Sequence, residues 1–194
     1  RRTPEARWPG LTKGFMKAAE EEGWRNLQDK NGVFEDGYFP IAIANSDGRR
    51  TSTATAYLTS DVRARPNFNI LGEAQVERIL FSGTRVTGVR VHRRGEVFDI
   101  QANEVIVSSG ALHSPALLLR SGVGPAAELR DADIDVVADR AGVGKHLMEH
   151  PGVNFGCYMK RDARLPPDLR PPMYAGLRWS SGVEGCPAGD MYMI

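Results

Sequence analysis

One stretch, residues 104–122, constrains the fold more than any other part of the chain. Glu104–Ser108 holds three adjacent apolar residues, as is typical of a β-strand buried on both faces. Ser114 is a favoured residue for the cap of a helix, Pro115 suits the first helical position, and Gly122 suits the position after the last one. The stretch therefore predicts a strand, a tight turn and a helix, which form one half of a doubly wound nucleotide-binding unit.

The turn inside this stretch is the best candidate for a binding site. Residues 108–111 are all small, so that a ligand could approach the backbone closely. The N-terminus of the following helix offers free N–H groups and a positive potential. These features favour an adenine nucleotide at the carboxyl ends of parallel strands, and a purely structural crossover is the alternative.

The remaining pattern predicts a mixed α/β fold. Ala74–Phe81, Val86–His92 and Val97–Ile100 alternate around tight turns, which predicts an antiparallel meander. Other expected elements are a helix over Leu11–Gly23 capped by Thr12, a helix over Thr51–Leu58 capped by Thr51 or Ser52, a short helix within Glu128–Asp139, and strands over Tyr38–Ala44, Asn67–Leu71, Ile134–Ala138 and from Met191 onward. The residues from Pro151 on are expected to be irregular, with short strands.

Composition narrows the possible partners. The 194 residues include 25 Lys and Arg against 24 Asp and Glu, so no strong field favours nucleic acid or an anionic membrane. No apolar run approaches the length of about 18 residues that predicts a membrane-spanning helix. Cys157 and Cys186 lie far apart without a C-x-x-C motif, which predicts reduced thiols and a cytoplasmic protein.

Two glycine motifs match a dinucleotide fingerprint only by their letters. Gly122–Ala127 reads G-x-G-x-x-A, but a predicted helix precedes it where the fingerprint requires a strand. The motif around Gly142 and Gly144 lacks the third small residue, because Leu147 stands there. A helix end followed by a turn is the better interpretation of the first motif.

A histidine motif raises the alternative of a zinc hydrolase. His146, Glu149 and His150 fit H-x-x-E-H, in which both imidazoles must share one helical face. Gly144 and Pro151 leave room for at most one helical turn, so a loop that binds backbone groups is favoured.

Two basic clusters have ordinary alternatives as well. Arg90–Arg94 is expected to be a solvated hairpin tip. Arg178 and Trp179 either line a pocket or belong to a strand core from which the arginine reaches solvent.

Several segments resemble the glucose–methanol–choline (GMC) family of flavoprotein oxidoreductases. GALHSPALLLRSGVG, residues 110–124, looks like the second signature of that family. GRRTSTATAYL followed by Arg65-Pro66-Asn67 resembles its R-x-S-T-A-x-x-Y-L…R-P-N-L stretch, and AGVGKHLMEHP resembles its P-G-V-G-x-N-L-x-D-H-P stretch. The resemblance runs in order from about Leu11 to Pro151; His146, Glu149 and Ala141 stand where the family usually has Asn, Asp and Pro.

This resemblance implies a fold and a function. It implies part of an FAD-binding Rossmann-like domain, made of the meander and the crossover strand and helix, with part of an α+β substrate-binding domain. Residues 51–140 would belong to the FAD domain, residues 1–50 to the substrate domain, and residues 141–194 to a linker and the substrate domain. The parent protein is expected to bind FAD and to oxidise a small primary alcohol by hydride transfer to the flavin.

The resemblance also assigns site residues by position. The backbone at Val76 would meet the adenine, Gly110 and Ala111 would lie under the adenosine half, and Ser114 would start the following helix. Neither the G-x-G-x-x-G fingerprint of the family nor its catalytic histidine is found in the sequence, so no catalytic residue is assigned. The fragment alone is expected to be inactive, and a non-catalytic excised module is a further alternative.

The C-terminal segment gives a hint about the substrate. Leu177–Ile194 is similar to the substrate-domain sheet of bacterial members that act on hydroxymethylfurfural, aryl alcohols or pyridoxine. Members of the choline and aliphatic-alcohol type stay open as alternatives.

Overall fold

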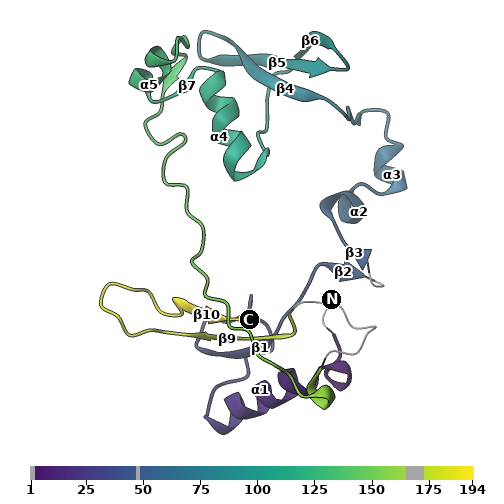
Figure 1. Ribbon diagram of the computed structural model, residues 1–194. Helices are drawn as coiled ribbons and strands as arrows, with labels where there is room; N and C mark the ends of the chain where they lie inside the picture. The colour runs from purple at the N-terminus through teal and green to yellow at the C-terminus, as the bar shows by residue number, and fades with distance from the viewer. Residues whose placement is uncertain (1–2, 47–48, 165–172) are drawn as a thin grey trace. The chain divides into compact units, whose positions relative to one another are not determined.

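Two units make up the part of the chain that the computed structural model describes, which is residues 3–46, 49–164 and 173–194. One unit comprises residues 67–153, and the other combines residues 1–66 with residues 154–194. Figure 1 shows the elements of each, and the units are described separately below. Helices occur with both antiparallel and parallel strands, which confirms the mixed α/β class.

The predicted meander is the main sheet of the first unit (Figure 1). Strands β4 (Gln75–Ser82), β5 (Arg85–Arg93) and β6 (Glu96–Gln101) pair antiparallel in the order β4-β5-β6. Both turns use a glycine in the left-handed region, with φ of +59° at Gly83 and +86° at Gly95. Because each hairpin closes over neighbouring residues, the alternating pattern alone was enough to predict this sheet.

Helix α4 (Gly110–Arg120) packs against β4 through its last turn. Ser121 ends the helix, and its hydroxyl accepts a hydrogen bond from the Ile79 N–H at 2.8 Å while donating to the Leu117 carbonyl at 2.6 Å. Gly122 follows with a φ of +83°, as predicted for the residue after the cap.

The predicted start of this helix was wrong. The helix begins at Gly110 after Ser109, so that Ser114 and Pro115 lie inside it and not at its first positions. Pro115 cannot donate the hydrogen bond that its nitrogen would otherwise make, yet the helix continues across it. The cap preference of Ser114 is used differently, because its hydroxyl accepts a hydrogen bond from the Ser109 N–H.

Two expected strands do not form. Glu104–Ser108 has no regular structure, and Ile106 is 83% exposed. A strand of this apolar kind needs hydrogen-bonded neighbours on both sides, and none of the described residues pairs with it. Asn67–Leu71 is likewise irregular. Apolar composition marked these segments, but composition does not supply a pairing partner.

A small β-α-β unit follows α4. Strands β7 (Val123–Gly124) and β8 (Ala138–Asp139) pair in parallel, and helix α5 (Ala126–Asp131) lies between them in the chain. The strand expected over Ile134–Ala138 is therefore shorter and shifted. Gly122 and Gly124 serve as a helix end and a strand, in agreement with the interpretation that did not make them a dinucleotide fingerprint.

The second unit is built around a sheet whose strands are far apart in the sequence. Strands β1 (Gly37–Pro40), β9 (Ala175–Trp179) and β10 (Met191–Met193) pair antiparallel in the order β1-β9-β10. The strand expected over Tyr38–Ala44 is thus shorter and starts one residue earlier, and the expected strand at Met191 is present. Phe39 in β1 is fully buried.

Helix α1 (Gly10–Glu21) packs near this sheet (Figure 1). Its Met16 and Ala19 join a buried core whose other members are Trp8, Tyr38 and Tyr174. The helix starts after Pro9 without a side-chain cap, so the predicted cap at Thr12 was wrong by three residues. Gly23, with a φ of +82°, follows its end as predicted.

The remaining elements are short. They are η1 (Glu5–Arg7), the paired strands β2 (Asn45–Ser46) and β3 (Arg49–Arg50), α2 (Thr53–Tyr57), α3 (Ser60–Arg63) and η2 (Arg161–Ala163). Ser52 caps α2 by accepting a hydrogen bond from the Thr55 N–H at 3.2 Å, which confirms one of the two predicted caps. None of the helices among the described residues combines the length and the apolar character that crossing a membrane requires.

Candidate functional site

The first turn of α4 presents an open stretch of backbone. Gly110 has a φ of +84°, and a Cβ at this position would meet no atom within 4 Å. Gly110 and Ala111 are exposed. The N–H groups of a first helical turn have no acceptor inside the helix, so they point toward whatever occupies this surface. The turn can therefore receive an oxygen-rich or anionic group next to its backbone.

Ser114 supports this turn from inside the helix. Its hydroxyl accepts the hydrogen bond of the Ser109 N–H at 2.9 Å, and the side chain is half-buried. This bond satisfies a backbone donor at the helix start that otherwise lacks a partner. Ser114 thus fixes the conformation of the chain before Gly110, which is a different role from the cap predicted for it.

Val76 lies on β4, where it pairs with Val91 beside an irregularity in the ladder between Val76 and Arg78. The bonds that join β4 to α4 fall at the end of the helix, where Arg120 Nε donates to the Glu77 carbonyl at 3.1 Å and Ser121 contacts Ile79. The structure therefore gathers three of the predicted site residues at the start of α4. The fourth lies on the strand against which the last turn of the same helix packs.

The chemical character of these residues suits the adenosine half of FAD. The open glycine would let a sugar or a phosphate approach the backbone, and the helix of 11 residues is long enough to have a developed positive end. A strand backbone such as that at Val76 can bind the edge of an adenine. The assignment of these residues to the cofactor stays a prediction.

The histidine motif does not form a metal centre. Residues 145–150 have no helix, so the imidazoles of His146 and His150 have no shared helical face. His150 and Glu149 approach each other to 3.3 Å, but both side chains are largely exposed. Across residues 3–46, 49–164 and 173–194, no three potential ligands gather as a metal would require. The zinc hydrolase alternative therefore finds no support in the geometry.

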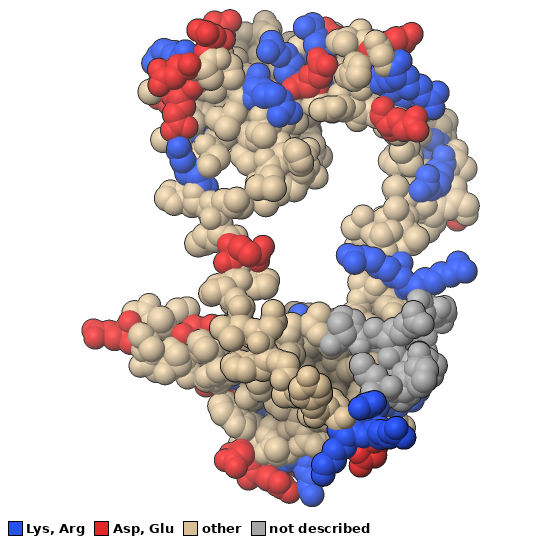
Figure 2. All heavy atoms as spheres, in the orientation of Figure 1, with Lys and Arg blue, Asp and Glu red and all other residues tan. Residues whose placement is uncertain are grey.

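The basic hairpin is a solvated surface with ion pairs. Arg90 donates two hydrogen bonds to Asp99 across β5 and β6, at 2.8 and 3.0 Å. The hydrogen bond from Arg90 lowers the pKa of Asp99 below its ordinary value, and the same bond raises the pKa of Arg90. Figure 2 shows blue and red side chains interspersed over this unit, in agreement with a solvated role.

Arg178 agrees with one of the two predictions made for it and departs from the other. The guanidinium does not extend into solvent, because the residue, near the end of β9, is only 4% exposed. It donates to the carbonyls of Lys30, Val33 and Glu35 at 3.0 to 3.2 Å and lies 3.9 Å from the ring centre of Phe34. It also lines a pocket, as one prediction had it. The burial follows from a loop at the other end of the chain, which no local pattern around Arg178 reveals.

Comparison with known proteins gives the family. The sequence profile of the GMC oxidoreductases matches residues 5–152. The 5-(hydroxymethyl)furfural oxidase of Methylovorus sp. (strain MP688) is 39% identical over 195 residues, which are 99% of this chain and 37% of that protein. An oxygen-dependent choline dehydrogenase of Burkholderia pseudomallei (strain 1710b) is 38% identical over 94% of this chain and 33% of its own length.

Solved structures agree with the sequence comparison. The crystal structure of pyridoxine 4-oxidase from Mesorbium loti matches with a TM-score of 0.66 and 33% identity, over 71% of this chain and 27% of that one. The chain thus spans well under half of the length of the relatives it matches. The profile match covers most of the chain, including the strands of the meander and the whole of α4. The chain belongs to the GMC oxidoreductase family, a family of FAD-dependent flavoproteins.

Proposed function

We propose that the parent protein of this chain is an FAD-dependent oxidoreductase that oxidises a primary alcohol. The observation that carries the proposal is the family match over residues 5–152, with the open first turn of α4 inside the matched region. Bound FAD would accept the hydride that the alcohol carbon loses. The contribution of this chain is to bind the cofactor and to form part of the substrate domain.

The binding role follows from the start of α4. Gly110 leaves room for the adenosine half of FAD against the backbone, and Ala111 keeps the next position small. Ser114 holds the preceding Ser109 in place through its hydrogen bond. Val76 would present its backbone to the adenine from β4. These four residues would orient the cofactor without taking part in the chemical step.

The proton of the alcohol needs an acceptor that we do not assign within this chain. His146 and His150 are exposed on an irregular segment, and His92 and His113 belong to β5 and α4. A general base must lie within hydrogen-bonding reach of the proton that it removes. The isolated chain is therefore expected to be catalytically inactive.

The substrate class that we propose is an aromatic ring carrying a hydroxymethyl group. The names of two relatives, a 5-(hydroxymethyl)furfural oxidase and a pyridoxine 4-oxidase, both point to such rings. A choline-like alcohol is the second candidate, because a choline dehydrogenase is nearly as similar in sequence. The free, exposed thiols of Cys157 and Cys186 support a reducing, cytoplasmic setting for the parent protein.

The test uses the full-length protein, whose residues keep the numbers that they have in this chain. Under anaerobic conditions, 5-(hydroxymethyl)furfural, pyridoxine, benzyl alcohol and choline are each mixed with the flavoprotein, and the flavin absorbance is followed. We expect at least one aromatic alcohol to bleach the flavin. A purified protein that holds no flavin, or whose flavin none of the alcohols reduces, would contradict the proposal and favour a non-catalytic module.

The role of the α4 turn is tested with a matched pair of variants. Gly110→Val adds a side chain at the proposed cofactor surface, whereas Gly95→Val adds one in the hairpin between β5 and β6. Both glycines have nearly the same φ, +84° and +86°, and both have open space where a Cβ would stand. The backbone strain is therefore alike, and only Gly110→Val should lower the flavin content of the purified protein. Equal flavin loss in both variants would place the cofactor elsewhere.

A further inference from the structure

A cavity lies in the unit that contains β1, β9 and β10. It has a volume of about 390 Å³ and is lined chiefly by Lys30, Asn31, Phe34, Arg178, Gly189 and Tyr192. Its walls are the loop before β1, the strands β9 and β10, and the end of the segment that joins those two strands. We call it the Arg178 pocket. Nothing in the function proposed above uses it.

Arg178 brings a buried positive charge to this pocket, and no carboxylate among the described residues pairs with it. Its three hydrogen-bond acceptors are all backbone carbonyls. The acidic side chains of the neighbouring segments have other partners: Asp29 accepts from the Asn31 N–H, Glu35 pairs with Arg25, Asp36 accepts from Ser180, and Asp190 accepts from Ser181. A guanidinium has five N–H donors, so the three bonds leave two of them unused. A buried charge is most stable when an opposite charge faces it.

The other walls of the pocket suit an anionic ring. Lys30 adds a second positive charge, and none of the lining residues is acidic. Phe34 and Tyr192 contribute aromatic surface, and both are substantially exposed, at 66% and 44%. Tyr192 is held in place by stacking on the buried Phe39, with ring centres 5.7 Å apart. Two cations beside aromatic rings favour a planar carboxylate and repel a quaternary ammonium group.

We propose that the Arg178 pocket binds a small aromatic carboxylate. The carboxylate would lie against Arg178 and Lys30, and the ring would lie along Tyr192 and Phe34. The pocket belongs to the unit that contains β1, β9 and β10, and the α4 turn belongs to the other unit. Benzoate binding and flavin reduction are measured separately, so that a failure of this proposal can be told apart from a failure of the proposed function.

The primary test is calorimetry of the full-length flavoprotein with benzoate as the probe. We expect one benzoate per chain, binding that weakens as salt is added, and at least about tenfold weaker binding of the neutral isostere benzamide. Lys30→Met should weaken benzoate binding about tenfold, because it removes one of the two charges but keeps the backbone carbonyl that Arg178 uses. Absence of benzoate binding, or equal binding of benzamide, would overturn the proposal.

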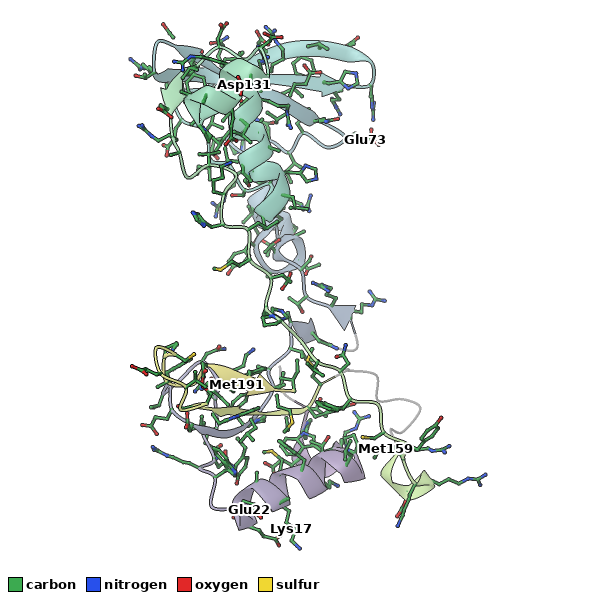
Figure 3. The ribbon with its side chains drawn as sticks, turned by 60° about the vertical axis from the view of Figure 1, so that its left-hand side comes forward. Lys17, Glu22, Glu73, Asp131, Met159 and Met191 are labelled. Atoms are coloured by element: carbon green, nitrogen blue, oxygen red, sulfur yellow. The ribbon has the colours of Figure 1, made fainter. Side chains whose placement is uncertain are left out.

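The matched control is Lys17→Met in α1. Figure 3 shows Lys17 on the side of the helix away from the strands, and its amine pairs with Glu21 on the same helix, at 3.5 Å. This variant has the same loss of charge and should leave benzoate binding unchanged. An equal loss of binding in the Lys17 and Lys30 variants would show that benzoate responds only to net charge, and the pocket assignment would fail.

Two further experiments locate the ring and the kind of ligand. Tyr192→Leu should weaken benzoate severalfold, whereas Tyr192→Phe keeps the ring and should bind nearly as wild type; the reverse order would contradict the proposed wall. 4-(Hydroxymethyl)benzoate, which carries both groups, is then tested as a reducing substrate with benzoate as competitor. Competitive inhibition would make the pocket part of the substrate site, and non-competitive inhibition would make it a separate ligand site. If Lys30→Met did not weaken benzoate binding, both interpretations would be overturned, because benzoate would not be bound in the Arg178 pocket.

Discussion

The two three-stranded sheets among the described residues reach the same antiparallel pairing by different routes. The β4-β5-β6 sheet is continuous in sequence, and each strand turns directly into the next. The β1-β9-β10 sheet joins residues 37–40 to residues 175–179, so most of the chain lies between two neighbouring strands. Closing such a long loop costs more conformational entropy than closing a hairpin does. We therefore expect the second sheet to depend on a few specific buried contacts and the meander to depend on many local ones.

Substitution of Arg178, which lies in the β1-β9-β10 sheet, should give the largest change in the free energy of unfolding. Arg178→Met keeps the length of the side chain but removes the donors to three carbonyls of the loop before β1. Leaving these groups without partners should cost about 3 kcal/mol in the free energy of unfolding. Urea unfolding of the purified protein measures it. A loss below about 1 kcal/mol would show that β1 and β9 stay together without this contact.

Substitution of Gly122 should give the second largest loss of stability, and it tests the packing at the end of α4. A Cβ at this residue would collide with the Asp135 carbonyl and the Val137 side chain, and its φ of +83° disfavours any L-residue. Gly122→Ala should therefore destabilise the protein by about 2 kcal/mol. Gly110→Ala is the control, because it has nearly the same φ but open space around it. Equal losses of stability in the two variants would mean that strain alone, and not packing, makes Gly122 necessary.

Substitution of Ser121 should have a smaller effect on the stability of the same unit. Ser121→Ala leaves the Ile79 N–H of β4 buried without its acceptor, which should cost about 1 kcal/mol. Ser109→Ala is the matched control, since the Ser109 side chain makes no cap hydrogen bond. Thermal unfolding of the two variants measures the difference. If both variants melt alike, the link between α4 and β4 does not depend on this hydroxyl.

Arg90 should have the smallest effect on stability, although it is an arginine in a strand like Arg178. Its partner Asp99 is solvent-facing, so Arg90→Met should hardly change the unfolding midpoint. The change should appear in the pKa of Asp99, which the hydrogen bond from Arg90 holds below 3.8. Any stability from this pair is present above that ordinary value and is lost as the pH falls through the lowered pKa.

A carboxyl titration followed by NMR measures this pKa. In Arg90→Met the pKa of Asp99 should rise toward 3.8. An unchanged pKa would mean that the pair seen across β5 and β6 does not persist in solution.

The candidate site could be predicted in its position but not in its details. The signature around Gly110 and Ser114 located the turn and the helix, because small residues, an aliphatic run and a closing glycine have local preferences. The sequence did not show that α4 starts at Gly110, because a cap preference at Ser114 can be met from inside the helix as well as at its end. It also gave no signal for the Arg178 pocket, whose walls come from residues about 30 and about 190.

What the sequence determined by itself is whatever depends on neighbouring residues. The meander, its glycine turns, the Ser52 cap and the ends of α1 and α4 all follow from alternation and from preferences for particular backbone angles. The tertiary structure alone decided that Glu104–Ser108 has no strand partner among the residues that the structure describes, and that Arg178 is buried under a distant loop. The physical reason is that pairing and burial depend on which groups are brought close in space, and a residue does not carry that information in its own neighbourhood.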